Sequence, residues 1–223
     1  NSNSNSNSNS NFMKKKKEIL NTNKCNISSE IISKRKDKLF WCFYISKFGE
    51  DNYINIINDE FKIETAFKLE AAEQMKHNEC ILKKHKIKRQ VVESELINDK
   101  YISLTTLYAL CLVYNLNVIY ISNFSYTHLC GCDETKNNKP CHLIKKDING
   151  IVSVTVNVEF IEIHKIIDKM HKMVSYNKPL LAFSGYKMSE LKDIAGKLDI
   201  CLINSLGSKK TKKLLYEEIL TKV

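Results

Sequence analysis

The sequence lacks the features that would identify a membrane protein, a secreted disulfide scaffold or a nucleotide hydrolase. Its longest apolar runs, such as residues 39–45, are far too short to cross a bilayer, so we expect no membrane insertion. No apolar signal segment lies near the start, and the eight cysteines are therefore expected to be reduced thiols of an intracellular protein. No glycine-rich phosphate loop and no Asp/Glu metal motif is present, which argues against nucleotide hydrolysis.

Glycine and proline are also scarce, with six and two residues, whereas Lys, Asn and Ile are abundant. This composition is typical of translation from an AT-rich genome. It resembles the proteins of nucleocytoplasmic large DNA viruses and those of some protists. The resemblance to the viral proteins implies a place in the cytoplasm, the nucleus, a viral factory or the virion. Virion proteins and host proteins would then be candidate partners.

Positive charge dominates, with a formal net charge of +10 at pH 7. The excess gathers in two regions: residues 14–47 hold ten basic against three acidic residues, and residues 178–223 hold nine against five. Such an asymmetric distribution favours a polyanionic partner. It predicts no sequence specificity, because contacts to phosphates carry none.

We divide the chain into four segments. Residues 1–13 are a low-complexity Asn/Ser leader that cannot form a core and is expected to be disordered. Residues 14–36 form a basic N-terminal segment, and residues 37–176 are long enough to be the main domain. Residues 177–223 form a small C-terminal module of two helices.

The main domain is predicted to be α+β, with a helical part followed by a small, mostly antiparallel sheet. Helical patterns cover residues 37–48, 59–98, 104–114 and 160–173, and strand patterns cover residues 117–122 and 142–158. The pattern of residues 59–98 fits either one long helix or two. The last of these is a hairpin, since residues 152, 154, 156 and 158 are valines that alternate with polar residues and predict one buried face. If Asn149 and Gly150 are its two central turn residues, His142 pairs with Asn157.

Cys42 and His142 form the first candidate for chemistry. A nucleophilic thiolate needs a lowered pKa, which a helix N-terminus and a neighbouring imidazole can supply. Cys42 lies early in a predicted helix and His142 opens a predicted strand. The alternative is that Cys42 is a small apolar residue of the core, as free cysteines commonly are.

The segments LFWCFYI, ISLTTLYALCLVYNLNVIYI and HLIKKDINGIVSV resemble, in order and type, those of papain-like and ovarian-tumour-type cysteine peptidases. In these families a Cys on an early helix precedes a helical region and a His at the start of a strand. The resemblance implies a thiol peptidase or deubiquitinase-like enzyme in which Cys42 is the nucleophile and His142 the base. Asn157 would be the residue that orients the imidazole.

A cluster of thiols and imidazoles offers a competing use of the same histidine. Five such residues fall within fifteen positions, namely His128, Cys130, Cys132, Cys141 and His142. Three thiolates with His128 or His142 would suit tetrahedral zinc, which makes zinc the one candidate cofactor. The alternative is that these are ordinary loop thiols. Zinc binding and catalysis by His142 exclude each other.

The C-terminal segment reads as two amphipathic helices joined by a basic turn. The first helix places Leu191, Ile194, Ala195 and Leu198 on one face, and Leu215 and Ile219 lie one turn apart in the second. Four lysines open the second helix: Lys209, Lys210, Lys212 and Lys213. Cations at a helix start oppose the macrodipole, and bound phosphate would offset that cost.

The segments YKMSELKDIAGKLDI and GSKKTKKLLYEEI resemble the SAP domain and the related Rho N-terminal helical domain. The resemblance implies a helix-extended-helix module that binds DNA or RNA through these four lysines. We therefore interpret the chain as a nucleic-acid-associated protein of a large DNA virus. The alternatives are a thiol peptidase with a targeting tail, a structural virion component, and a helix pair whose lysines are merely solvated.

Overall fold

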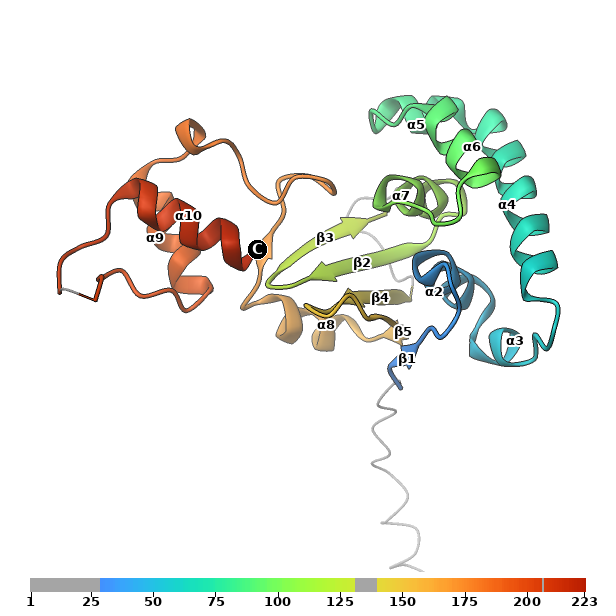
Figure 1. Ribbon diagram of the computed structural model, residues 1–223, viewed down its shortest axis with the longest axis horizontal. Helices are drawn as coiled ribbons and strands as arrows, with labels where there is room; N and C mark the ends of the chain where they lie inside the picture. Colours follow the sequence, from blue (N-terminus) through green and yellow to red (C-terminus); the bar gives the residue numbers. More distant parts are fainter. Residues whose placement is uncertain (1–28, 131–139, 206) are drawn as a thin grey trace, which may run out of the picture.

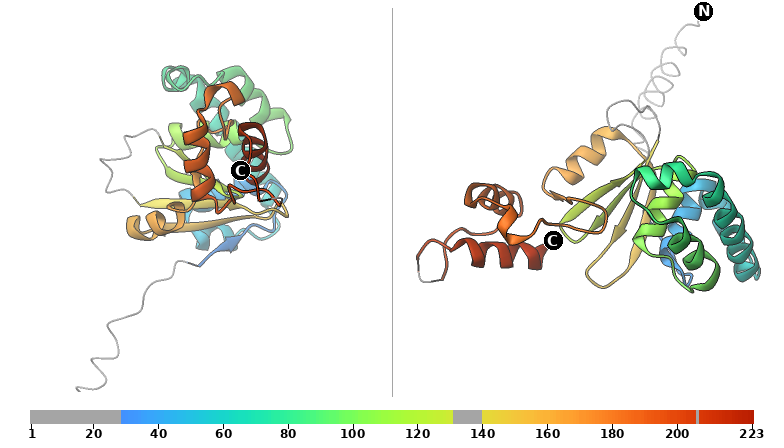
Figure 2. Two further views of the ribbon diagram at one scale, coloured as in Figure 1. Left: turned by 90° about the vertical axis from the view of Figure 1, so that its left-hand side faces the viewer. Right: turned by 90° about the horizontal axis from the view of Figure 1, so that it is seen from above.

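A mixed β-sheet separates two layers of helix in the computed structural model, which describes residues 29–130, 140–205 and 207–223 (Figures 1 and 2). The strand order is β1-β5-β4-β2-β3-β6, with β2 parallel to β4, β3 parallel to β6, and the other neighbours antiparallel. The strands are β1 (Ile31–Ile32), β2 (Asn117–Ser122), β3 (Ser125–Leu129), β4 (Cys141–Lys146), β5 (Val152–Val158) and β6 (His171–Lys172).

Helices cover both faces of the sheet. On one side, α2 and α7 pack against the strands with α4, α5 and α6 outside them, and α8 covers the opposite face (Figure 2). The helices of this domain are α2 (Lys38–Phe48), α3 (Glu50–Ile54), α4 (Glu60–His77), α5 (Glu79–Lys84), α6 (Arg89–Asn98), α7 (Leu104–Val113) and α8 (Phe160–Ile167). The predicted α+β class is confirmed.

The main core forms around the aromatic helix α2. Phe40, Trp41 and Phe43 are fully buried, and their rings contact those of neighbouring aromatic residues edge to face or at a tilt. The helix begins after Asp37, whose buried carboxylate accepts hydrogen bonds from the Phe40 amide and from the Lys68 ammonium at 2.7 Å. One side chain thus caps α2 and ties it to α4.

The hairpin turn differs from the predicted one. Its loop has three residues, Ile148 to Gly150, because the Asp147 carboxylate accepts from the amides of Asn149 and Ile151. Gly150 closes the loop with φ of +75°, a conformation that glycine adopts without strain. Leu143 therefore pairs with Thr155, whereas Cys141 pairs with Val158. His142 falls in the register shift between these two pairs and has no one-to-one partner on β5, so the predicted pairing with Asn157 is not formed.

A β-bulge near the end of β5 also divides the valines between the two faces. Asn157 has a left-handed φ of +55° next to the register shift between Cys141 and Leu143. Val152 and Val154 face the α2 side, whereas Val158 lies in the cluster under α8. The extra residue reverses the alternation, so the prediction of one common buried face is wrong at Val158.

The sheet starts before the predicted domain boundary at residue 37. Ile31 and Ile32 pair with Val154 and Ser153 of β5. The Arg35 guanidinium then lies between the rings of Trp41 and Tyr53, about 4 Å from each centroid. The last residues of the basic N-terminal segment are thus part of the main domain.

The C-terminal module has a small core of its own. Helix α9 (Met188–Lys197) and helix α10 (Lys212–Lys222) pack together, and an extended link between them closes through the bridge between Ile203 and Lys209. The buried residues are Leu180, Tyr186, Leu191, Ala195, Leu198, Leu215 and Ile219. The chain ends beside the β2–β3 hairpin, where the Ser125 hydroxyl donates to the carbonyl of Val223 (Figure 1).

Within residues 29–130, 140–205 and 207–223, no helix combines the length and the apolar character that crossing a bilayer would require.

Candidate functional site

Cys42 is sealed inside the main core. It is the fifth residue of α2, more than one turn from the Asp37 cap, and it is fully buried. Burial first, and the Asp37 charge second, raise the pKa of its thiol to about 12. A thiol in this environment is held in its protonated form at neutral pH, which gives no support to the nucleophilic role that the sequence predicted.

His142 lies on the same face of the sheet as Cys42 but does not activate it. It is the second residue of β4, pairs in register with Val118, and is buried toward the α2 side. Burial lowers the pKa of its imidazole to about 4, and Nδ1 has no hydrogen-bond partner among the described residues. Within that same part of the chain, no hydrogen bond joins His142 to Cys42.

Asn157 stands apart from the other two residues of the predicted triad. It is exposed, has the left-handed conformation of the β5 bulge, and lines a cavity on the α8 side of the sheet. The side chain that was expected to orient His142 is therefore placed on the other side of the sheet. These three residues form no accessible Cys-His-Asn arrangement.

The candidate zinc ligands are only partly described. Cys132 lies outside the described residues, whereas His128 lies in β3, Cys130 directly follows that strand and Cys141 begins β4. Burial first and Cys130 second raise the pKa of Cys141 to about 12, so these two thiols are electrostatically coupled. No group of three or more His, Cys, Asp or Glu side chains within the described residues could hold a metal ion, and zinc stays a prediction.

The four lysines at the start of α10 have different environments. Lys209 and Lys213 are exposed, and neither makes an ion pair with any described residue. The Lys210 ammonium contacts the Glu218 carboxylate at 2.6 Å and its side chain is only 10% exposed. Lys212 lies 4.6 Å above the Phe183 ring. Lys210 and Lys212 thus make contacts within the module, whereas Lys209 and Lys213 face solvent.

The backbone at the start of α10 is arranged in a way that also suits an anion. The Thr211 hydroxyl accepts from the Leu214 amide, and no acidic residue occupies the first turn. The amides of Lys212 and Lys213 come before that of Leu214, the first amide that the Thr211 cap satisfies. These two amides point out of the helix end. Positive partial charge from these amides therefore adds to the charge of Lys209 and Lys213.

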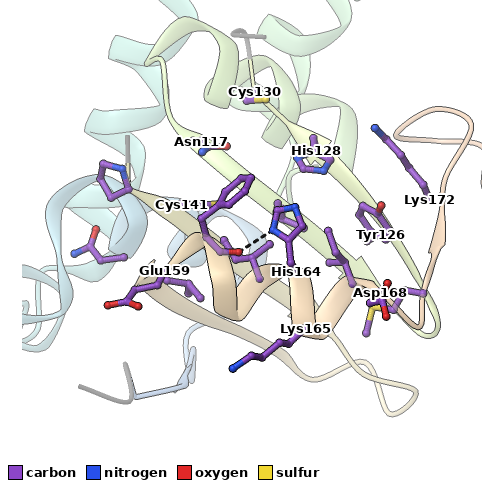
Figure 3. Close-up of a pocket in the computed structure, with 18 of the residues that line it drawn as sticks. Asn117, Tyr126, His128, Cys130, Cys141, Glu159, His164, Lys165, Asp168 and Lys172 are labelled. Carbon is purple, nitrogen blue, oxygen red and sulfur yellow. Dashed lines mark hydrogen bonds between the residues drawn. The ribbon is translucent and has the colours of Figure 1, made fainter. Parts of the chain in front are cut away.

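A cavity of about 1390 Å³ lies between the sheet and α8 (Figure 3). The sequence pattern did not predict it. Its floor is apolar and includes Ile119, Cys141, Val158 and Ile163, which belong to one buried cluster. Polar, charged and aromatic residues line the rest, and one of them, Lys197, comes from helix α9 of the module. The pattern of residues 160–173 indicated a helix, which in the structure ends at Ile167, but nothing indicated which strands it would face.

Comparisons with protein-family models, with curated proteins and with solved structures find no match to this chain.

Proposed function

We propose that this protein binds nucleic acid through its C-terminal module. The observation that carries the proposal is the pair of exposed lysines, Lys209 and Lys213, beside an α10 start that has a threonine cap and no acidic residue in its first turn. Phosphate oxygens would accept from the two ammonium groups and from the open amides of that turn.

The surrounding contacts support the proposal because they hold the extended link and the helix together. Lys210 reaches Glu218 two turns along α10, and its amide donates to the Leu202 carbonyl. These contacts fix the backbone between Lys209 and Lys213, so the two cations are presented from an ordered surface. A phosphate-binding role for Lys210 would require breaking its ion pair, which narrows the proposed contacts to Lys209, Lys213 and the helix start.

The alternative functions, a thiol peptidase and a structural virion component, are supported to different degrees. Burial of Cys42 gives the thiol peptidase no support, since substrate cannot reach that sulfur. The compositional resemblance supports the further proposal that the protein comes from a large DNA virus. A structural virion component would use the same basic surface for assembly with an acidic protein partner.

The first prediction tests the lysine pair with the double variant Lys209→Gln/Lys213→Gln. We expect it to fold normally, to bind duplex and single-stranded oligonucleotides about tenfold or more weakly at low salt, and to lower the duplex salt slope by about 2. Fluorescence anisotropy across a salt series measures both quantities. The physical reason is that binding releases fewer counterions when fewer phosphates are neutralised.

A matched control removes the same charge elsewhere. Lys62 in α4 and Lys100, two residues after α6, are exposed, and Figure 1 shows both helices far from α9 and α10. Lys62→Gln/Lys100→Gln should therefore leave the salt slope unchanged. Equal losses in both double variants would show that only net charge matters. Unchanged binding in the Lys209/Lys213 variant would remove the proposed function and favour the structural role.

A further inference from the structure

The cavity under α8 has aromatic rings on two opposing walls. Phe160 is 65% exposed at the start of α8, and its ring centroid lies 4.1 Å from that of His164. The imidazole is held in place because its Nδ1 contacts the Phe160 carbonyl oxygen at 2.8 Å, the dashed line in Figure 3. Across the cavity, β3 contributes Tyr126 and His128, whose rings meet edge to face at 5.7 Å.

The polar groups of the cavity suit the edges of a base. Asn117 at the start of β2 and Asn157 at the β5 bulge both line it, and each amide offers donors and an acceptor. The apolar floor between them is formed by the α8-side cluster, including Ile119 and Val158. A flat, apolar ring with polar edges fits such a lining better than a compact ion does.

The charges around the cavity favour an anionic ligand. Three lysines line it, Lys165, Lys172 and Lys197, against two carboxylates, Glu159 and Asp168. Lys165 and Lys197 are exposed. Because Lys197 belongs to α9, the cavity adjoins the same module that carries the proposed phosphate-binding lysines.

We propose that this cavity receives unstacked bases of single-stranded nucleic acid, with the phosphates of the strand against Lys165 and Lys197. The inference rests on the proposed function, which it extends by naming the form of the ligand. Aromatic side chains in a basic groove bind single strands because every unstacked base presents a ring face, whereas a duplex covers those faces by stacking. The Phe160–His164 pair is the exposed stacking surface.

The test compares two variants of neighbouring exposed residues on α8 in the full-length chain. Phe160→Ala removes a ring that lines the cavity, and Ile161→Ala removes a side chain that is 68% exposed but is not part of the lining. With a labelled oligothymidylate of about 12 nucleotides, Phe160→Ala should weaken binding about tenfold, the effect of removing one base–aromatic stack. Ile161→Ala should leave it unchanged, and neither should alter binding of a duplex of equal length.

A second variant, Lys165→Gln/Lys197→Gln, should lower the salt slope for the single strand, by roughly 0.7 for each lysine–phosphate interaction that the substitutions remove. It also keeps the test valid if Phe160→Ala folds poorly.

The outcomes separate this inference from the proposed function. If Lys209→Gln/Lys213→Gln weakens binding of both strands and duplex while the cavity variants bind the single strand normally, the cavity proposal is wrong and the module proposal stands. If only the cavity variants lose affinity, the module proposal falls and the cavity remains. Binding of thymidine monophosphate with no preference for the strand would also overturn the inference, as would the absence of any nucleic-acid binding.

Discussion

The starts of α2 and α10 are built alike and placed in opposite environments. Each helix is capped by a side-chain oxygen, from Asp37 in α2 and from Thr211 in α10. At α2 the cap is buried, and the residues that follow it are packed among aromatic rings. At α10 the cap is exposed, and the lysines around it reach solvent or the module's own surface.

The comparison shows that a helix start is not by itself a functional site. Each helix carries, at or near its start, a residue type that suits chemistry or binding at a helix N-terminus: a thiol just beyond the first turn of α2, and lysines at the start of α10. The Cys42 thiol is fully enclosed by the core, so burial raises its pKa and blocks access. Lys209 and Lys213 keep their charge available because both side chains are exposed. The two helix starts therefore differ in how accessible their side chains are, rather than in their local sequence motif.

The largest expected difference between the two regions concerns thiol reactivity. At pH 8, iodoacetamide should alkylate Cys42 at least about a thousandfold more slowly than the exposed Cys201, because a pKa raised from 9.0 to about 12 lowers the thiolate fraction by that factor. Mass spectrometry of time points measures both rates. Equal rates in the folded protein would break the comparison and restore the peptidase alternative.

The raised pKa of Cys42 also makes the free energy of unfolding depend on pH in a definite direction. The native state holds the Cys42 proton more tightly than the unfolded chain does. The stabilisation of the folded state that this proton contributes is therefore fully present below about pH 9. It should be lost as the pH rises from there toward 12. Urea unfolding of wild type and Cys42→Ala over this range isolates the contribution as the difference between the two pH profiles.

The next effect is on stability at the buried cap. Asp37→Ala removes the α2 cap and one of two carboxylates that pair with the buried Lys68, the other being Glu64. We expect a loss of about 3–5 kcal/mol, as for other broken buried pairs. Urea unfolding followed by the fluorescence of Trp41, the single tryptophan, measures it.

An exposed ion pair provides the control for that loss. Glu73 pairs with Lys76 on the outer surface of α4, with both side chains more than half exposed. Glu73→Ala should leave the free energy of unfolding nearly unchanged, because solvent screens an exposed ion pair. A loss below about 1 kcal/mol for Asp37→Ala would show that its buried contacts contribute little to holding α2 against α4.

The smallest effect is expected at the exposed cap. Thr211→Ala should destabilise α10 by about 1 kcal/mol, while Thr211→Ser should retain most of the stability because the hydroxyl remains. Hydrogen exchange of the α10 amides detects this locally, since the module contains no tryptophan. A Thr211→Ala loss as large as that at Asp37 would remove the contrast between the two helix starts.

Local patterns predicted most of the helices and strands, and long-range pairing accounts for the errors. The strand 117–122 and the helix after Asp37 were predicted at their observed bounds, since period and cap residues are local signals. Residues 59–98, expected to form one helix or two, form the three helices α4, α5 and α6. The parallel pairing of β2 with β4 was not predicted, because it joins residues that are far apart in the chain.

The candidate sites show the same division. The exposed lysines could be found from charge alone, whereas the Lys210–Glu218 pair depends on how the link folds back on α10. The cavity under α8 combines residues of several strands, helix α8 and the module, and no stretch of sequence contains enough of them to suggest it. The misplacement of Asn157 came from the bulge, because its extra residue reverses the alternation of side chains at the end of β5.

Periodicity, capping and charge within short windows predict the α+β class, the apolar helix after Asp37, the hairpin and the basic character of the C-terminal segment. The burial of Cys42, the placement of His142 and Asn157 on different sides of the sheet, and the lysine that the module adds to the cavity follow from the packing of distant elements. No short window contains this information, because burial and proximity depend on which elements pack together. A single shift in strand register or one side chain packed over a site reverses them without changing any local pattern.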